Sequence, residues 1–177
     1  MNTANKLTVF RIILVPFFVL FMLTDFTQYN QLIALIIFII ASITDHFDGY
    51  VARKYNMITT FGKFMDPIAD KLLVSSALIC LTALGTIPAW AVIIIILREF
   101  AISGLRLVAA ENGGVIAAAG WGKAKTASQM TAIIMLLLPI PQLYTISIIV
   151  FYVAVVLTVI SLIDFLLKNK EMLITDK

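Results

Sequence analysis

Four aspartates occur in two closely spaced pairs. Asp45 and Asp48 are three residues apart, and Asp66 and Asp70 are four apart, so each pair projects from one face of a helix. Carboxylates this close cannot all ionise unless protons are shared or cations neutralise them. An all-oxygen ligand set suits Mg²⁺ or Mn²⁺, whereas Zn²⁺ usually binds His or Cys, and the chain has one of each. The pairs therefore favour a site for hard divalent cations.

The helices that position these pairs are expected to lie in a membrane. Hydrophobic residues make up 62% of the chain and charged residues 13%, unlike a soluble protein. The apolar residues gather in six stretches that approach the length of about 20 residues needed to cross a bilayer. We predict an all-α integral membrane protein, a six-transmembrane-helix bundle in a single domain over residues 1–177. The predicted spans are Leu7 to Leu23, Leu32 to Val51, Phe64 to Leu84, Ala89 to Ala110, Trp121 to Leu138 and Leu143 to Leu167.

The basic residues predict the orientation of the bundle. All 13 Lys and Arg residues fall on ends or loops of one predicted side, although Arg98 lies well inside its helix. The loops around Asp25, Gly85 and residues 139–141 carry none. Because cytoplasmic loops retain Lys and Arg, both termini are expected to be cytoplasmic in a multi-pass protein of the cell membrane. The net charge of +3 would face anionic lipid headgroups, so no nucleic-acid partner is required.

The two aspartate pairs are predicted to lie at matching depth. The turn between the second and third spans centres near Ile58, with Asp48 and Asp66 ten and eight residues away. Asp45 and Asp70 are thirteen and twelve residues away. At about 1.5 Å per residue, these positions lie roughly 12 to 20 Å along an antiparallel hairpin. Ionised side chains inside a membrane are kept mainly where they face a cavity or a partner, so we expect one site that opens toward the cytoplasm.

Small residues accompany the aspartates at helical spacing. Gly49 and Ala52 each follow an aspartate of the first pair by one turn, and Gly62 precedes the second pair by one turn. Missing side chains there would admit a bulky ligand, whose phosphates Arg53 could bind. The alternative is that Gly and Ala serve close helix packing, as in many membrane proteins. His46 points to a different helix face, so we expect it to pack or lie at the interface rather than bind metal.

The pattern from Asp45 to Asp70 resembles the signature of the CDP-alcohol phosphotransferase family. The signature reads Asp, two residues, Asp-Gly, two residues, Ala-Arg, eight residues, Gly, three residues, Asp, three residues, Asp, and every position is matched. The segments NKLTVFRI, LREFAISGLRLVAAENG and GWGKAKTASQM also resemble bacterial members that use glycerol 3-phosphate. The resemblance covers most of the chain, and it implies a six-helix membrane bundle that forms a homodimer.

The resemblance also implies a reaction and roles for these residues. A phosphatidyl group would pass from CDP-diacylglycerol to glycerol 3-phosphate, giving phosphatidylglycerophosphate and CMP. Two divalent cations, Mg²⁺ or Mn²⁺, would hold the diphosphate through Asp45, Asp48 and Asp66. Asp70 would accept the proton of the acceptor hydroxyl while also contacting a metal. The candidates around the nucleotide are Thr8, Gly49, Ala52, Arg53 and Gly62.

The phosphate of glycerol 3-phosphate requires a second cationic site. The candidates are Arg98, Arg106, Lys123 and Lys125. Arg98 lies deep in an otherwise apolar helix, where an unpaired guanidinium would be unfavourable and a bound phosphate would be a suitable partner. The alternatives for Arg98 are an internal ion pair with Glu99 or an aspartate, or extension of the side chain toward water. Lys123 and Lys125 could instead contact lipid phosphates.

Two other functions share some of these features. Another acceptor, such as phosphatidylglycerol in a cardiolipin synthase, inositol phosphate or serine, would fit the same signature. A cation or proton transporter would also place aspartates inside the membrane, but its polar groups should continue to the opposite face. The outer halves of these spans are almost wholly apolar. The basic residues and the LREF and GKAKT segments favour glycerol 3-phosphate as the acceptor.

Overall fold

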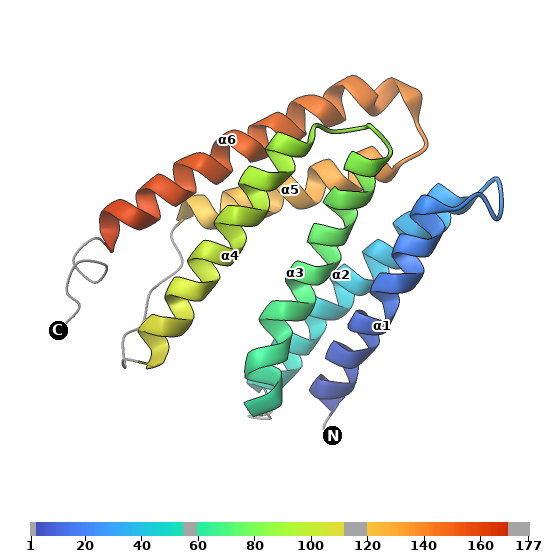
Figure 1. Cartoon of the computed structure of the whole chain (residues 1–177). Helices are drawn as coiled ribbons and strands as arrows, with labels where there is room; N and C mark the ends of the chain where they lie inside the picture. The colour runs from blue at the N-terminus through green and yellow to red at the C-terminus, as the bar shows by residue number, and fades with distance from the viewer. Residues whose placement is uncertain (1–2, 55–59, 112–119, 170–177) are drawn as a thin grey trace. The chain divides into compact units, whose positions relative to one another are not determined.

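Six helices match the six apolar stretches. A computed structural model describes residues 3–54, 60–111 and 120–169, but not the side chains of 3–6, 45–54, 60–64, 66, 67, 70, 110 and 111. The described residues form six α-helices, one 3-10 helix and no strand, so the all-α prediction is confirmed. Each helix begins and ends within four residues of its predicted stretch. The bounds are α1 Thr3–Leu23, α2 Asn30–Lys54, α3 Thr60–Ala83, α4 Ala89–Glu111, α5 Gly120–Leu137, η1 Pro141–Leu143 and α6 Tyr144–Lys168 (Figure 1).

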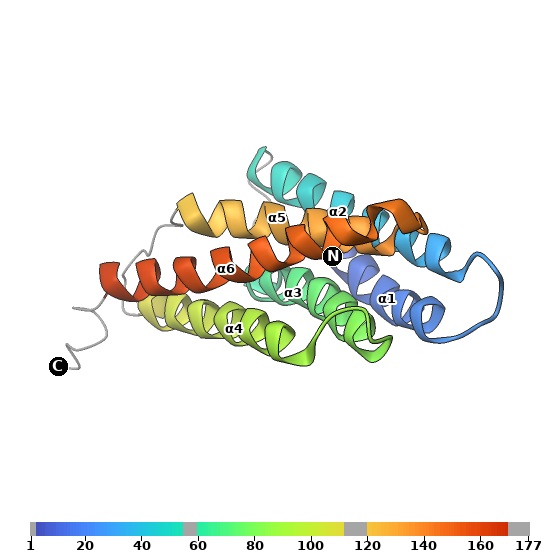
Figure 2. The same ribbon diagram turned by 90° about the horizontal axis from the view of Figure 1, so that it is seen from above.

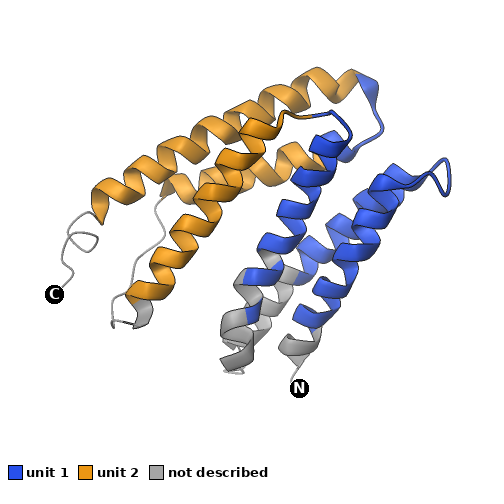
Figure 3. Cartoon of the chain, in the orientation of Figure 1, with its two compact units in different colours: residues 1–86, 136–141 blue, residues 87–135, 142–177 orange. Residues whose placement is uncertain are grey.

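The chain divides into two compact units. Unit 1 comprises Met1–Thr86 and Leu136–Pro141, and it contains α1, α2 and α3 (Figure 3). Unit 2 comprises Ile87–Met135 and Gln142–Lys177, and it contains α4, α6 and nearly all of α5. The aspartate pairs therefore belong to unit 1, and the four predicted acceptor-binding cations belong to unit 2.

In unit 1, α1 makes most of the described contacts between helices. Among the described residues, it packs against both α2 and α3, which contact each other less. The rings of Phe18 on α1 and Phe38 on α2 lie 5.9 Å apart, and both side chains are fully buried. Ala34 and Ala41 on α2 are also fully buried, which allows close approach of the helices. The sequence prediction considered only the pair of α2 and α3, and it did not indicate that α1 packs against both.

Glycine ends α3 at the boundary of unit 1. Gly85 has a φ of 71°, a left-handed conformation that glycine adopts without a steric penalty. The Gly85 N–H donates to the Thr82 carbonyl and the Thr86 N–H to the Leu81 carbonyl, each at 2.9 Å. These two bonds form a Schellman motif, which satisfies carbonyls at the end of the helix. The chain can therefore leave α3 sharply before Pro88.

In unit 2, α4 and α6 run side by side in the same direction. The rings of Trp90 and Tyr152 stack at 6.2 Å near the start of the two helices. Arg98 contacts Ser161 further along, and Arg106 lies over the ring of Phe165 near their ends. Residue numbers rise together along both helices, as the parallel course in Figures 1 and 2 also shows.

α6 has the clearest membrane character in the part of the chain that the structure describes. The segment Pro141–Lys168, 28 residues long, is the one helical stretch there that is both long and apolar enough to cross a membrane. Shorter apolar helices cover Leu7–Leu23, Asn30–Thr44 and Lys71–Ala83. α4 has 23 residues, but Arg98, Glu99 and Arg106 interrupt its apolar sequence. Six spans and the position of the termini remain predictions from the sequence.

Replacing Phe38 with alanine should destabilise unit 1. The fully buried ring fills the contact between α1 and α2, so Phe38→Ala leaves a cavity that we expect to lower stability by about 3 kcal/mol. Thermal melting in detergent measures the loss. Ile40→Ala on the same helix is the control, because that side chain is 46% exposed. Equal melting temperatures for the two variants would contradict this packing.

Candidate functional site

The four aspartates lie at similar distances from one end of unit 1. Asp45 and Asp48 stand nine and six residues before Lys54, the last residue of α2, and Asp66 and Asp70 stand six and ten residues after Thr60, the first residue of α3. At about 1.5 Å per residue, all four lie roughly 9 to 15 Å from those helix ends. The helix bounds are thus compatible with the predicted depth. The structure does not describe the side chains of several predicted residues. These are the four aspartates, Gly49, Ala52, Arg53, Gly62 and His46.

Two polar residues of α1 are buried near the same end. The start of α1, the end of α2 and the start of α3 lie at the same end of unit 1 (Figure 1). Thr8, a predicted nucleotide contact, is 1% exposed, and Arg11 is fully buried. They stand five and eight residues after Thr3, so they lie at about the depth of the aspartates. The sequence prediction had used Arg11 only for orientation, although a basic residue within an apolar stretch was an available signal.

Arg98 and Lys125 meet through one carboxylate. Nε of Arg98 donates to Oγ of Ser161 at 3.0 Å, and Nη1 donates to Oε1 of Glu99 at 3.2 Å. Nζ of Lys125 donates to the same Oε1 atom. Arg98 is 9% exposed and Lys125 is 2% exposed, so both cations are buried. We call Arg98, Glu99, Lys125 and Ser161 the α4–α5–α6 cluster.

Helix geometry explains how neighbouring residues reach different helices. Successive residues of a helix project about 100° apart, so Arg98 and Glu99 can serve different neighbours. Arg98 extends to Ser161 of α6, while Glu99 meets Lys125 of α5. The cluster therefore joins all three helices of unit 2. Sequence reasoning missed Ser161 altogether and considered Glu99 only as an alternative partner for Arg98.

The cluster carries a formal charge of +1, from two cations and one carboxylate. The ion pair of Arg98 with Glu99, one of the alternatives that the sequence left open, is present, and Ser161 is a second partner of Arg98.

The other two predicted cations lie apart from this cluster. Arg106 is exposed, and its Cζ lies 5.9 Å from the centroid of the Phe165 ring, a cation–π contact. Lys123 is exposed near the start of α5. The structure therefore brings Arg98 and Lys125 together within the cluster, whereas Arg106 and Lys123 remain accessible at the surface of unit 2.

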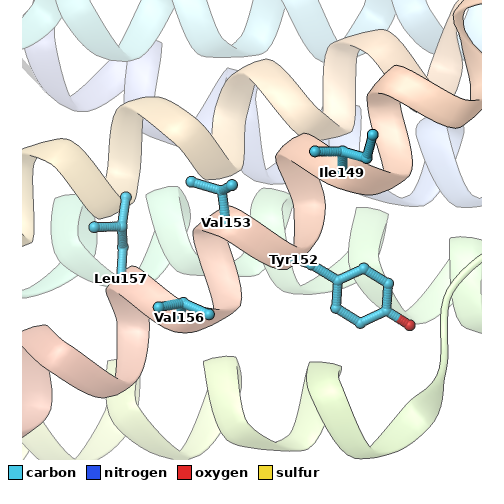
Figure 4. Close-up of a pocket in the computed structure, with 5 residues that line it drawn as sticks. All are labelled: Ile149, Tyr152, Val153, Val156 and Leu157. Atoms are coloured by element: carbon cyan, nitrogen blue, oxygen red, sulfur yellow. The ribbon is translucent and has the colours of Figure 1, made fainter.

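A groove along α6 has no side chains suited to catalysis. Its volume is about 380 Å³, and its lining is almost wholly apolar. Figure 4 shows the lining residues, all of which belong to α6. These are Ile149, Tyr152, Val153, Val156 and Leu157. Such a surface suits contact with hydrocarbon rather than binding of a charged substrate.

Gly122 leaves room for the guanidinium of Arg98. A Cβ added at Gly122 would lie 3.5 Å from Nη2 of Arg98, an ordinary contact distance. Gly122→Ala should therefore fold normally, whereas Gly122→Leu should displace the guanidinium from Ser161 and lower stability by about 1–3 kcal/mol. The control is Gly104→Leu, because a Cβ there meets nothing within 4 Å. If both leucine variants melt at the same temperature, this position of the guanidinium is incorrect.

Comparisons with known proteins identify the family. A model described as CDP-alcohol phosphatidyltransferase matches residues 1–160. The chain is 47% identical over 189 residues to the "CDP-diacylglycerol--glycerol-3-phosphate 3-phosphatidyltransferase" of Bacillus subtilis (strain 168), covering 98% of each chain. It is 43% identical over 181 residues to the protein of that name from Haemophilus influenzae, covering 98% of this chain and 96% of the relative. A "Probable phosphatidylglycerophosphate synthase" of Mycobacterium tuberculosis (strain ATCC 25618 / H37Rv) is 42% identical over 170 residues, covering 94% of this chain and 81% of the relative. The family resemblance predicted from the sequence is confirmed, and the chain belongs to the CDP-alcohol phosphatidyltransferase family.

Proposed function

We propose that this protein transfers the phosphatidyl group of CDP-diacylglycerol to sn-glycerol 3-phosphate, giving phosphatidylglycerophosphate and CMP. The names of the Bacillus and Haemophilus relatives describe this transfer, and identity to them extends over nearly the whole chain. The observation that carries the choice of acceptor is the buried cationic cluster of unit 2, because glycerol 3-phosphate brings a phosphate besides the reacting hydroxyl. The family match spans helices of both units, which supports one membrane-embedded domain over residues 1–177.

The proposed metal ligands are Asp45, Asp48 and Asp66, with Asp70 beside them. Their all-oxygen chemistry fits two Mg²⁺ or Mn²⁺ ions. The described helix bounds set both pairs at similar distances from one end of unit 1, which suits a shared site. When bound, such ions neutralise the diphosphate and stabilise the departing CMP.

Asp70 is the proposed general base. It takes the proton of an acceptor hydroxyl, so the oxygen can attack the phosphorus that bears diacylglycerol. The new bond joins this oxygen to phosphorus, and the bond from that phosphorus to the bridging oxygen breaks, so CMP leaves with the electron pair. Thr8, Gly49, Ala52, Arg53 and Gly62 are proposed to surround the nucleotide, and the burial of Thr8 fits a lining position.

Arg98 and Lys125 are the proposed centre of acceptor-phosphate binding. Their guanidinium and ammonium groups suit charge-assisted hydrogen bonds to phosphate oxygens. Arg106 and Lys123 are proposed as outer contacts, since both are exposed. Lys125 is buried and bonded to Glu99, which favours this role over anchoring to lipid headgroups. Lys123 remains suited to either role.

We also propose six membrane spans, with both termini and the active site on the cytoplasmic side of the cell membrane. The parallel course of α4 and α6 fits this topology, because helices separated by one intervening span cross in the same direction. Large apolar side chains on the outer face of α1 are about half exposed, as lipid contact requires. The protein is proposed to act as a homodimer among membrane lipids.

Release of CMP tests the reaction and its acceptor. Purified protein in detergent, supplied with CDP-diacylglycerol and Mg²⁺ or Mn²⁺, should release CMP with glycerol 3-phosphate and stop when EDTA is added. Phosphatidylglycerol, inositol phosphate and serine are the comparison acceptors. Release with phosphatidylglycerol alone would make the protein a cardiolipin synthase. If no acceptor yields CMP, the enzyme proposal is wrong and an ion-flux assay in vesicles tests the transporter alternative.

Asp70→Asn should separate binding from turnover. Asparagine keeps an oxygen ligand but cannot accept the proton, so we expect turnover to fall at least about 1,000-fold while metal-dependent binding of the CDP-lipid is retained. Equilibrium binding of labelled CDP-diacylglycerol is measured beside CMP release. Asp66→Asn is the comparison, because a ligand without a base role should weaken binding as well. Equal loss of binding and turnover in Asp70→Asn would remove the separate base role.

A further inference from the structure

The two buried cations of unit 2 share a single oxygen. Nη1 of Arg98 and Nζ of Lys125 both donate to Oε1 of Glu99. Without this carboxylate, two positive groups at such short separation would repel each other in a site of low dielectric. Glu99 therefore fixes both the distance between the two cations and the direction in which each side chain extends.

Ser161 fixes the other side of the guanidinium. Its Oγ donates to the Thr158 carbonyl at 3.1 Å, so its hydrogen is directed along α6. A lone pair of the same Oγ then accepts from Nε of Arg98 at 3.0 Å. Ser161 is 1% exposed, so water does not readily replace it. The guanidinium plane is thereby held at both Nε and Nη1.

These contacts direct the remaining guanidinium nitrogen toward the start of α5. Nη2 lies beside Gly122, which has no side chain to cover it. Gly122 belongs to the first turn of α5, whose N–H groups carry partial positive charge and lack acceptors within the helix. An anion at this position would meet the guanidinium and the helix terminus together.

We infer that Glu99 and Ser161 are positioning residues. They hold Arg98 and Lys125 as a preformed binding site for the phosphate of the acceptor. This inference rests on the proposed function. Neither residue touches the substrate in this account, and both act through Arg98, with Glu99 also acting through Lys125. Preorganisation of charged donors before the substrate arrives removes an ordering cost from binding, so the effect should fall on acceptor affinity.

Steady-state kinetics of Glu99→Gln and Ser161→Ala test the inference. We expect the KM for glycerol 3-phosphate to rise at least about tenfold in Glu99→Gln and at least about threefold in Ser161→Ala. The KM for CDP-diacylglycerol and kcat should stay within about threefold of the parent values, because the aspartate site is untouched. Ser161→Thr retains the hydroxyl and should restore the acceptor KM, a rescue that a purely structural role of side-chain size would not give.

Unit 2 supplies matched controls for both substitutions. Asp164→Asn removes a carboxylate that pairs only with exposed Lys168 at 2.8 Å in the described contacts of that group. Ser147→Ala removes a buried hydroxyl from α6, where it donates to the Leu143 carbonyl at 2.7 Å. Both controls should keep the parent KM for glycerol 3-phosphate. Melting temperatures of all variants show whether each protein is folded.

Three results would overturn the inference. The acceptor KM could remain unchanged, it could fall because Glu99 competes with the substrate for the cations, or both KM values and kcat could worsen together as in general damage. Lys125→Met separates this failure from failure of the proposed function. If Lys125→Met raises the acceptor KM while Glu99→Gln does not, only the positioning role is wrong. If neither changes it, the cluster does not bind the acceptor.

Discussion

The carboxylate oxygen shared by Arg98 and Lys125 is the contact on which the described polar site depends. Each of these cations loses hydration when it is buried, and the two repel each other. Glu99 offsets both effects and leaves one positive charge in the cluster. Under the proposed function, the same three charged groups would stabilise unit 2 and bind the phosphate of the acceptor.

The helices of unit 2 are arranged so that this contact can form. The parallel course of α4 and α6 sets Arg98 opposite Ser161, and α5 brings Lys125 to Glu99. Stacking of Trp90 on Tyr152 and the contact of Arg106 with Phe165 hold the two ends of the same helix pair. The aromatic contacts and the charged contacts therefore occur along the same pair of helices.

In unit 1, α1 packs against the two helices that carry the aspartates. Four aspartates on two helices repel one another, so direct packing of α2 on α3 at their level would be unfavourable without cations. The described packing relies on α1, which contacts both helices and sets its buried Phe18 against Phe38 of α2. Thr8 and Arg11 of α1 are also buried. Apolar contacts can thus support the aspartate-bearing helices away from the charges. Metal affinity then need not supply the whole stability of this unit.

The sequence by itself determined the helices and the family. Apolar stretches and their breaks are local features, so the six helix bounds were predicted within four residues. The aspartate signature spans 26 residues, and its spacing alone indicated the family that the comparisons confirm. The acceptor phosphate implied by the resemblance also drew attention to Arg98 and Lys125, but the sequence did not indicate that they share a partner.

Only the tertiary structure decided how those cations are held. Ser161 lies 63 residues after Arg98, and Lys125 lies 26 residues after Glu99, so no local pattern connects them. A serine within an apolar helix has no sequence feature that marks it as a partner for a guanidinium. The packing of α1 against both α2 and α3 was likewise not predicted, because apolar stretches carry no local mark of which helices contact each other. The contacts of the cations and the packing of α1 both depend on which helix faces meet. The choice of faces depends on packing among several helices rather than on any one segment.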